Sequence, residues 1–236
     1  MKKVVSIIIL FTLVFSLVSC DIDTSTDDSY TSNSANGESL LDVEDTSSDV
    51  PSISYFAFGN YEQDGNTDNG AEPIEWIVLK EEGSKKLLIS RYILDYQEFN
   101  DTVIAQGTSW KNSTLRKWLN NEFFDLAFSS NEQKQIISSQ VQDYKADNVP
   151  GDITTDKVFI LNKEQAFTLF GSDYDRATSS TNYAKSRKIY VTNAYWLVNS
   201  YSSDLYKYLI NNEGANENNP RVNESEGVRP VIWVSN

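Results

Sequence analysis

Histidine is absent from all 236 residues, and Cys20 is the only cysteine. The missing imidazole removes the usual general base at neutral pH and the commonest zinc ligand. A single thiol allows neither an intramolecular disulfide nor a cysteine metal cluster. Composition therefore excludes Ser-His-Asp triads, Cys-His dyads and histidine-zinc centres, and it leaves carboxylates as the plausible acid-base groups.

Basic residues are also scarce, with 20 Lys and Arg against 34 Asp and Glu and a formal net charge of −14. A chain of this charge repels phosphate backbones, so nucleic acid is not an expected partner. No organic cofactor is expected either, because no motif for one stands in the sequence.

The N-terminus has the pattern of a targeting segment. Lys2 and Lys3 precede an apolar run over residues 4–18, which is shorter than the roughly 20 residues of a membrane-spanning helix. The run ends in Leu17-Val18-Ser19-Cys20, which resembles the lipobox of bacterial lipoproteins. The resemblance implies a signal peptide over 1–19, a lipid on the sulfur of Cys20 and a place on the extracytoplasmic face of the cell membrane. An ordinary signal peptide and an uncleaved anchor are the alternatives.

The segment after the cysteine is acidic and polar. Residues 21–52 hold nine Asp and Glu and no Lys or Arg. Such a stretch buries too little apolar surface to offset its ordering entropy, so we predict a disordered tether over 20–52. A flexible coil of about 32 residues would place the domain on the order of 30 Å from the membrane. A binding role for the acidic segment is the alternative.

Residues 53–236 have a size suited to a single globular domain. Alternating apolar positions predict strands, and Ser or Asn caps before apolar faces predict helices. The predicted strands cover 54–59, 74–79, 86–90, 158–161, 195–198 and 228–234, and the predicted helices begin after Asn112-Ser113, at Ser130 and after Asn162. The third helix is expected to bury Ala166, Phe167 and Phe170. The fold class predicted is α+β, a single mixed domain with antiparallel strands and several short capped helices.

Several short strings follow one another in a characteristic order along this domain. They are 58–64 (FGNYEQD), 73–79 (PIEWIVL), 87–90 (LLIS), Trp110 with 115–120 (LRKWLN), 155–159 (TDKVF), 183–185 (YAK) and 227–233 (GVRPVIW). Together they resemble a bacterial domain of unknown function, number 6273, over nearly all of residues 56–234. The resemblance implies a surface protein of the Firmicutes type.

The ending of the domain is similar to that of C-type-lectin-like domains related to the sulfatase-modifying-factor fold. Two departures limit what this resemblance implies. Family members often carry Trp-Trp-Leu-Arg-Ser where this chain has Tyr195-Trp196-Leu197-Val198-Asn199, so a ligand contact by that arginine is in doubt. The cysteine chemistry of formylglycine-generating relatives is excluded, because the domain has no cysteine.

One loop has the spacing of a calcium site. Within residues 64–75, oxygen side chains occupy the offsets that calcium loops use, namely Asp64, Asn66, Asp68, Glu72 and Glu75. Asn69 stands where the sharp turn of such a loop needs glycine, and the flanks read as strands. A solvated hairpin loop is therefore the favoured interpretation, with calcium as the alternative.

Aromatic and basic side chains supply the other ligand candidates. Aromatic faces stack on sugar rings, and residues set among Ser and Asn are the ones expected to be exposed. These are Trp110, Tyr201, Tyr206 and Tyr208, whereas Trp118 and Trp233 lie on apolar faces and read as core. Arg116 and Arg229 could bind a carboxylate, although a structural ion pair is the favoured reading for both.

The sequence thus predicts a lipid-anchored extracellular domain. Its expected role is non-catalytic binding of a cell-envelope or environmental ligand, which could be a glycan, a peptide or a protein. One alternative is a polysaccharide-degrading enzyme that uses two carboxylates, although no spacing in the sequence singles out a pair. The other alternative is a structural module of a surface complex.

Overall fold

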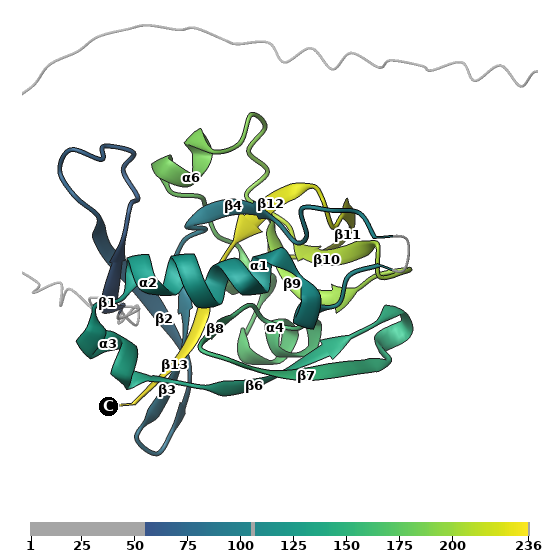
Figure 1. The fold of residues 1–236 in the computed structure, drawn as a ribbon, viewed down its shortest axis with the longest axis horizontal. Coiled ribbons are helices and arrows are strands. Elements are labelled where there is room, and N and C mark those ends of the chain that lie inside the picture. Colours follow the sequence, from purple (N-terminus) through teal and green to yellow (C-terminus); the bar gives the residue numbers. More distant parts are fainter. Residues whose placement is uncertain (1–54, 105–106, 236) are drawn as a thin grey trace, which may run out of the picture. The chain divides into compact units, whose positions relative to one another are not determined.

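Two sheets form the framework of the domain, and short helices pack against them (Figure 1). The computed structural model describes residues 55–104 and 107–235, so the predicted signal peptide and tether lie outside the described residues. The described residues form one compact unit with its own core. No helix in the described ranges is long and apolar enough to cross a membrane.

The larger sheet has six strands, all paired antiparallel. Their order is β1-β2-β3-β13-β5, and β8 also pairs with β13. The bounds are β1 Phe56–Tyr61, β2 Glu72–Glu82, β3 Lys85–Ser90, β5 Ile136–Ile137, β8 Val158–Phe159 and β13 Val231–Ser235. The predicted pair of strands over 74–79 and 86–90 is confirmed as the β2–β3 hairpin. Gly83 makes its turn with a φ of +60°, a conformation that glycine adopts without strain.

The smaller sheet has five strands in the order β11-β10-β9-β12-β4. Its pairs are antiparallel except β12 with β9, which is parallel. The bounds are β4 Asp95–Glu98, β9 Tyr195–Ser200, β10 Tyr206–Ile210, β11 Asn216–Arg221 and β12 Ser225–Val228. A separate two-stranded ribbon joins β6 (Ser139–Tyr144) to β7 (Pro150–Asp156).

The single strand predicted over 228–234 is wrong, because the chain passes there from one sheet to the other. β12 ends at Val228 in the smaller sheet, and β13 begins at Val231 in the larger one. Pro230 has no N–H to donate to a ladder, so a continuous strand is disfavoured at this point. Its carbonyl accepts the N–H of Ser90 at 3.0 Å and ties the crossing to β3.

The helices are short, and five of them, α1, α3, α4, α5 and α6, begin at side-chain caps. Their bounds are η1 Trp110–Asn112, α1 Thr114–Trp118, the π-helix η2 Leu119–Phe123, α2 Phe124–Ala127, α3 Ser130–Gln135, η3 Ala146–Asn148, α4 Lys163–Leu169, α5 Asp173–Arg176 and α6 Asn182–Ser186. The helix predicted after Asn162 is confirmed, and the Asn162 side chain accepts the N–H of Gln165. The helix predicted at Ser130 exists, but its cap is Ser129 paired with Glu132.

The α+β class with antiparallel strands and capped helices is confirmed. Trp76, Trp196 and Phe123 are fully buried in one core that draws on both sheets and on the α1–α2 segment. The predicted burial of Phe167 is wrong, since this side chain is 39% exposed. Its ring instead lies 4.0 Å from the guanidinium of Arg176, which is the more buried of the two side chains.

Candidate functional site

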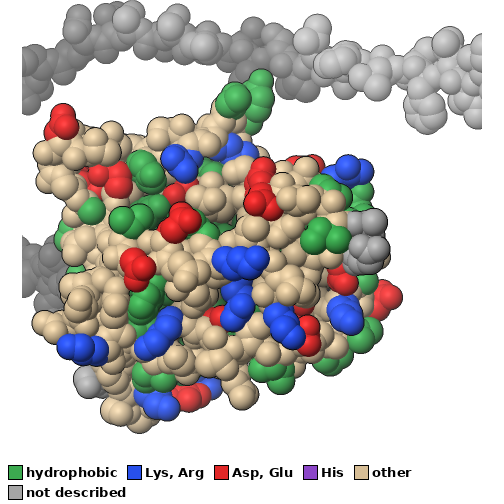
Figure 2. Space-filling model, in the orientation of Figure 1, with side chains coloured by type: hydrophobic (Ala, Val, Ile, Leu, Met, Phe, Trp, Pro, Cys, Tyr) green, Lys and Arg blue, Asp and Glu red, His purple; other side chains and the backbone are tan. Residues whose placement is uncertain are grey.

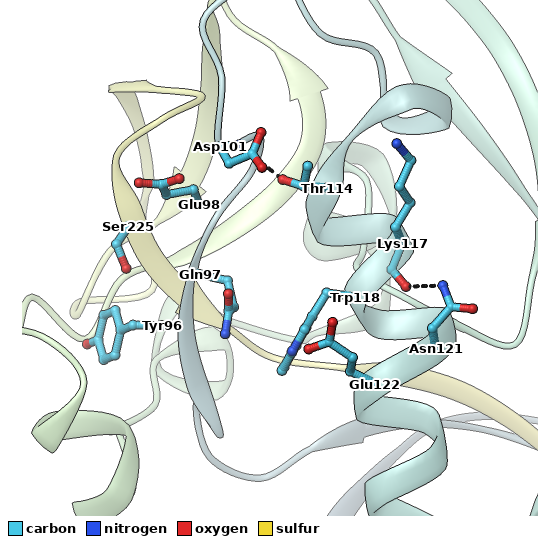
Figure 3. A pocket seen from close by; sticks show the side chains of 10 residues that line it. All are labelled: Tyr96, Gln97, Glu98, Asp101, Thr114, Lys117, Trp118, Asn121, Glu122 and Ser225. Carbon is cyan, nitrogen blue, oxygen red and sulfur yellow. Dashed lines mark hydrogen bonds between the residues drawn. The ribbon is translucent and has the colours of Figure 1, made fainter.

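A polar groove lies between strand β4 and the helical segment formed by α1 and η2 (Figure 3). It has a volume of about 580 Å³. The residues that line it are Tyr96, Gln97, Glu98, Asp101, Thr114, Lys117, Trp118, Asn121, Glu122 and Ser225. Two chain segments and one residue of β12 therefore build a single open site.

Backbone and side-chain hydrogen bonds fix the helix against the strand. The Ser113 hydroxyl caps α1 by accepting the N–H of Arg116 at 3.1 Å. The Thr114 hydroxyl accepts the N–H of Asp101 at 3.0 Å, and the Thr114 N–H donates to the side-chain oxygen of Asn100 at 3.1 Å. These contacts join the segment that follows β4 to the first turn of α1, so they hold the two walls of the groove at a fixed separation.

Trp118 forms the aromatic part of the wall. It is half-buried, and its ring packs on Phe123 with 5.4 Å between centroids. The turn that follows is π-helical, a local widening that is frequent at functional sites. Leu119 and Phe123 of that turn face the core, while Glu122 projects beside Trp118 toward β4 (Figure 3).

The groove is acidic. The groove lining contains three acids, Glu98, Asp101 and Glu122, and one cation, Lys117. The formal charge of the groove is therefore negative. Burial and the neighbouring charge of Asp101 raise the pKa of Glu98 above the ordinary value. The site therefore disfavours anions, whereas its carboxylates and the amides of Gln97 and Asn121 can accept and donate hydrogen bonds to hydroxyl groups.

Trp110, predicted to be exposed, is fully buried, and that prediction is wrong. Its indole N–H donates to the carboxylate of Asp156 at 2.9 Å. Asp156 also accepts from Nε of Arg116 at 2.7 Å and from the hydroxyl of Thr154 at 2.6 Å. The favoured reading of Arg116 as a structural ion pair is confirmed, and the pair binds α1 to β7 behind the groove.

Arg229 is buried and forms no ion pair with any residue of 55–104 and 107–235. Its Nε donates to the carbonyl of Ser90 at 2.8 Å, and its Nη1 donates to the carbonyl of Arg176 at 3.0 Å and to the Tyr195 hydroxyl at 3.3 Å. This side chain holds the crossing between the two sheets in place. The predicted ion pair at Arg229 is wrong.

The three candidate tyrosines are half-buried and lie away from the groove, on and before β10. The rings of Tyr201 and Tyr208 meet edge to face at 5.3 Å, and the ammonium of Lys163 lies 4.2 Å above Tyr208. Tyr206 instead neighbours Arg221. Val198, at the place of the family arginine, is fully buried. Asn199 beside it lines a separate pocket of about 420 Å³ and accepts the backbone N–H of Lys163.

The loop predicted as a calcium alternative does not gather the predicted oxygen set. Glu75 lies in β2 and pairs with Arg91 at 2.7 Å. Carboxylates of Glu62, Asp64 and Glu72 do approach one another within 4.8 Å. Each of these three carboxylates already accepts a backbone N–H of the same loop, which is how a solvated turn is stabilised.

We expect the melting temperature to be the same in millimolar calcium and in excess chelator, because Glu75 of the predicted oxygen set is paired with Arg91 and does not join the loop carboxylates. Thermal unfolding followed by circular dichroism measures this, since a ligand of the folded state raises the melting temperature. A calcium-dependent rise that is lost in Asp64→Asn, but kept in Asp152→Asn on an exposed part of β7, would contradict the expectation.

Sequence reasoning missed Glu98, Asp101 and Glu122, and it assigned Trp118 to the core. Trp118 and Glu122 are four residues apart on a capped helix, a spacing that places two side chains on one face. The sequence alone could therefore have placed Trp118 and Glu122 side by side. It could not have placed them next to Glu98, because that contact depends on how α1 packs on β4.

The groove lies within the part of the chain that matches a known family. A sequence model described as a domain of unknown function (DUF6273) matches residues 83–236. Among curated proteins nothing matches the chain, and no solved structure matches it either.

Proposed function

Since this chain belongs to the DUF6273 family, whose description assigns no activity, we propose from the groove itself that the domain binds a polyhydroxylated ligand, an envelope glycan, without turning it over. The observation that carries the proposal is the half-buried Trp118 beside Glu98 and Glu122 in one open groove. An aromatic face packs on the C–H face of a sugar, and carboxylates accept hydrogen bonds from its hydroxyls.

The proposed setting is the outer face of the cell membrane. A lipid on Cys20, with residues 1–19 removed and residues 20–52 as a tether, would hold the domain near envelope polymers. The C-type-lectin-like architecture belongs to the same proposal. It is supported by the resemblance of the terminal segment 227–233, whose two parts enter different sheets.

The test is binding of purified domain to an array of bacterial envelope polysaccharides, followed by calorimetry with the best-bound oligosaccharide. Trp118→Ala is expected to weaken binding several-fold, up to about tenfold, since an aromatic stacking contact contributes about 0.5–1.5 kcal/mol. The matched control is Tyr174→Ala, which removes an aromatic side chain that is 88% exposed and outside the groove. Equal affinities of both variants would count against the groove as the binding site.

A two-carboxylate enzyme is the second candidate, and one observation favours it. Glu98 has a raised pKa in the same groove as Glu122, the arrangement in which one carboxyl can act as acid and the other as base or nucleophile. Release of new reducing ends that is abolished by both Glu98→Gln and Glu122→Gln would establish this candidate and overturn non-catalytic binding. Capture of one protein partner with no glycan bound would instead favour the structural-module alternative.

A further inference from the structure

The loop that follows α6 carries three consecutive apolar side chains in water. Ile189 is 91% exposed, Tyr190 is 81% exposed and Val191 is 38% exposed. We call these three residues the apolar tip. In Figure 2, the protrusion that carries α6 ends in hydrophobic side chains, with Lys and Arg side chains just below them. A contiguous exposed apolar patch on a soluble domain marks an interaction surface.

Both stems of the loop are fixed to the body of the domain. The carboxylate of Glu226 accepts from the ammonium of Lys188 at 2.7 Å, before the tip, and from the hydroxyl of Thr192 at 3.1 Å, after it. The side-chain oxygen of Asn193 then accepts both the N–H and the hydroxyl of Ser180. The tip cannot fold back onto the core without breaking these bonds, so the apolar side chains are held outward.

The charge around the tip is opposite to that of the chain. Residues 183–193 contain three basic residues and no acid, in a protein with a net charge of −14. Lys185 and Arg187 are exposed, and Nε of Arg187 lies 3.5 Å from the carboxylate of Asp95. Lys188 is bound to Glu226. Apolar side chains next to Lys and Arg are the features that bind an interfacial segment to anionic lipid.

We propose that the apolar tip inserts into the headgroup region of an anionic lipid bilayer. The proposal rests on the proposed lipid anchor in one respect, which is that the anchor brings the domain to a membrane. A fully extended chain of about 32 residues spans up to about 110 Å, so residues 21–52 are long enough for the loop to reach the bilayer in any orientation of the domain. The base of the loop adjoins the groove, since Lys188 lies 5.0 Å above the ring of Tyr96. Insertion would therefore hold the groove next to the membrane surface.

The experiment uses the chain from Cys20 onward, coupled through its only thiol to a maleimide lipid in vesicles of equal phosphatidylglycerol and phosphatidylcholine. Tyr190→Trp places a reporter in the tip, and brominated lipid quenches tryptophan that enters the bilayer. We expect quenching of the added emission by about twofold or more, since interfacial segments reach the acyl boundary. The matched control, Tyr174→Trp, places the same reporter at an exposed position on α5 and is expected to show no quenching.

The proposal is overturned if the emission of Tyr190→Trp is not quenched, or is quenched no more than that of Tyr174→Trp. Replacing Lys185 and Arg187 with serine should reduce the quenching, as should vesicles of phosphatidylcholine alone. Undiminished quenching in both would overturn the assignment to anionic lipid. Because the coupling chemistry supplies the anchor and no glycan is present, none of these results depends on lipidation in the cell or on binding in the groove.

Discussion

Replacing Asp156 with alanine is expected to lower the free energy of unfolding by about 3–5 kcal/mol. The carboxylate is 2% exposed and accepts three side-chain hydrogen bonds, from Trp110, Arg116 and Thr154. Alanine would leave a guanidinium, an indole N–H and a hydroxyl without their buried acceptor, and each unsatisfied group adds to the loss. Urea denaturation followed by tryptophan fluorescence measures the effect.

Asp152 supplies a matched control on the same strand. Its carboxylate pairs with Lys111 at 3.7 Å, and both side chains are more than half exposed. Exposed ion pairs contribute at most about 1 kcal/mol, so Asp152→Ala should change stability little. Similar losses in the two variants would show that Asp156 does not organise the contact between α1 and β7. Since α1 carries Trp118, glycan binding by Asp156→Ala should weaken along with its stability.

The parts of the fold that the sequence predicted are those set by neighbours in the chain. The β2–β3 hairpin depends on alternating apolar residues and a glycine turn, and α4 depends on Asn162 and Gln165 three residues apart. Such signals act over a few residues, so they can be read without knowing the rest of the structure. Cap position is less secure, as the shift from Ser130 to Ser129 shows.

The parts that could not be predicted depend on distant partners. Trp110 stands among polar residues, which suggests exposure, but its acceptor Asp156 is 46 positions away and lies on β7. The segment 228–234 has the composition of one strand, yet its halves serve two sheets. The groove could not be predicted for the same reason, because no local sequence pattern specifies how the elements that carry Glu98 and Glu122 pack together.

Lys207 is the buried charge with the clearest consequence for stability. Its side chain is fully buried, and its ammonium donates to the Ser200 hydroxyl at 2.9 Å and to the carbonyl of Val198 at 3.3 Å. Burial lowers the pKa of Lys207 to about 8, against an ordinary 10.5, and the charges of Asp143 and Asp204 offset this only in part. A protonated lysine is therefore less favourable in the folded chain than in the unfolded one.

The free energy of unfolding should consequently rise with pH above 8. Between pH 8 and 10.5 the unfolded chain holds more protons on Lys207 than the folded chain does, so deprotonation favours folding. At about 1.4 kcal/mol per pKa unit, the rise from pH 7 to 9.5 amounts to about 2 kcal/mol. The pKa of Tyr61 and that of Tyr195 are raised by burial, which acts in the opposite direction above pH 10, so the measurement stops below that value.

Lys207→Met should abolish this rise, because methionine fills similar space and does not titrate. Lys80→Met is the control, since its side chain is 51% exposed and its removal should leave the pH dependence intact. A rise that persists in Lys207→Met would assign it to another group, and a flat wild-type curve would mean that Lys207 stays charged throughout. In either case, Asp143 and Asp204 would have to stabilise the buried ammonium more strongly than their positions in the fold indicate.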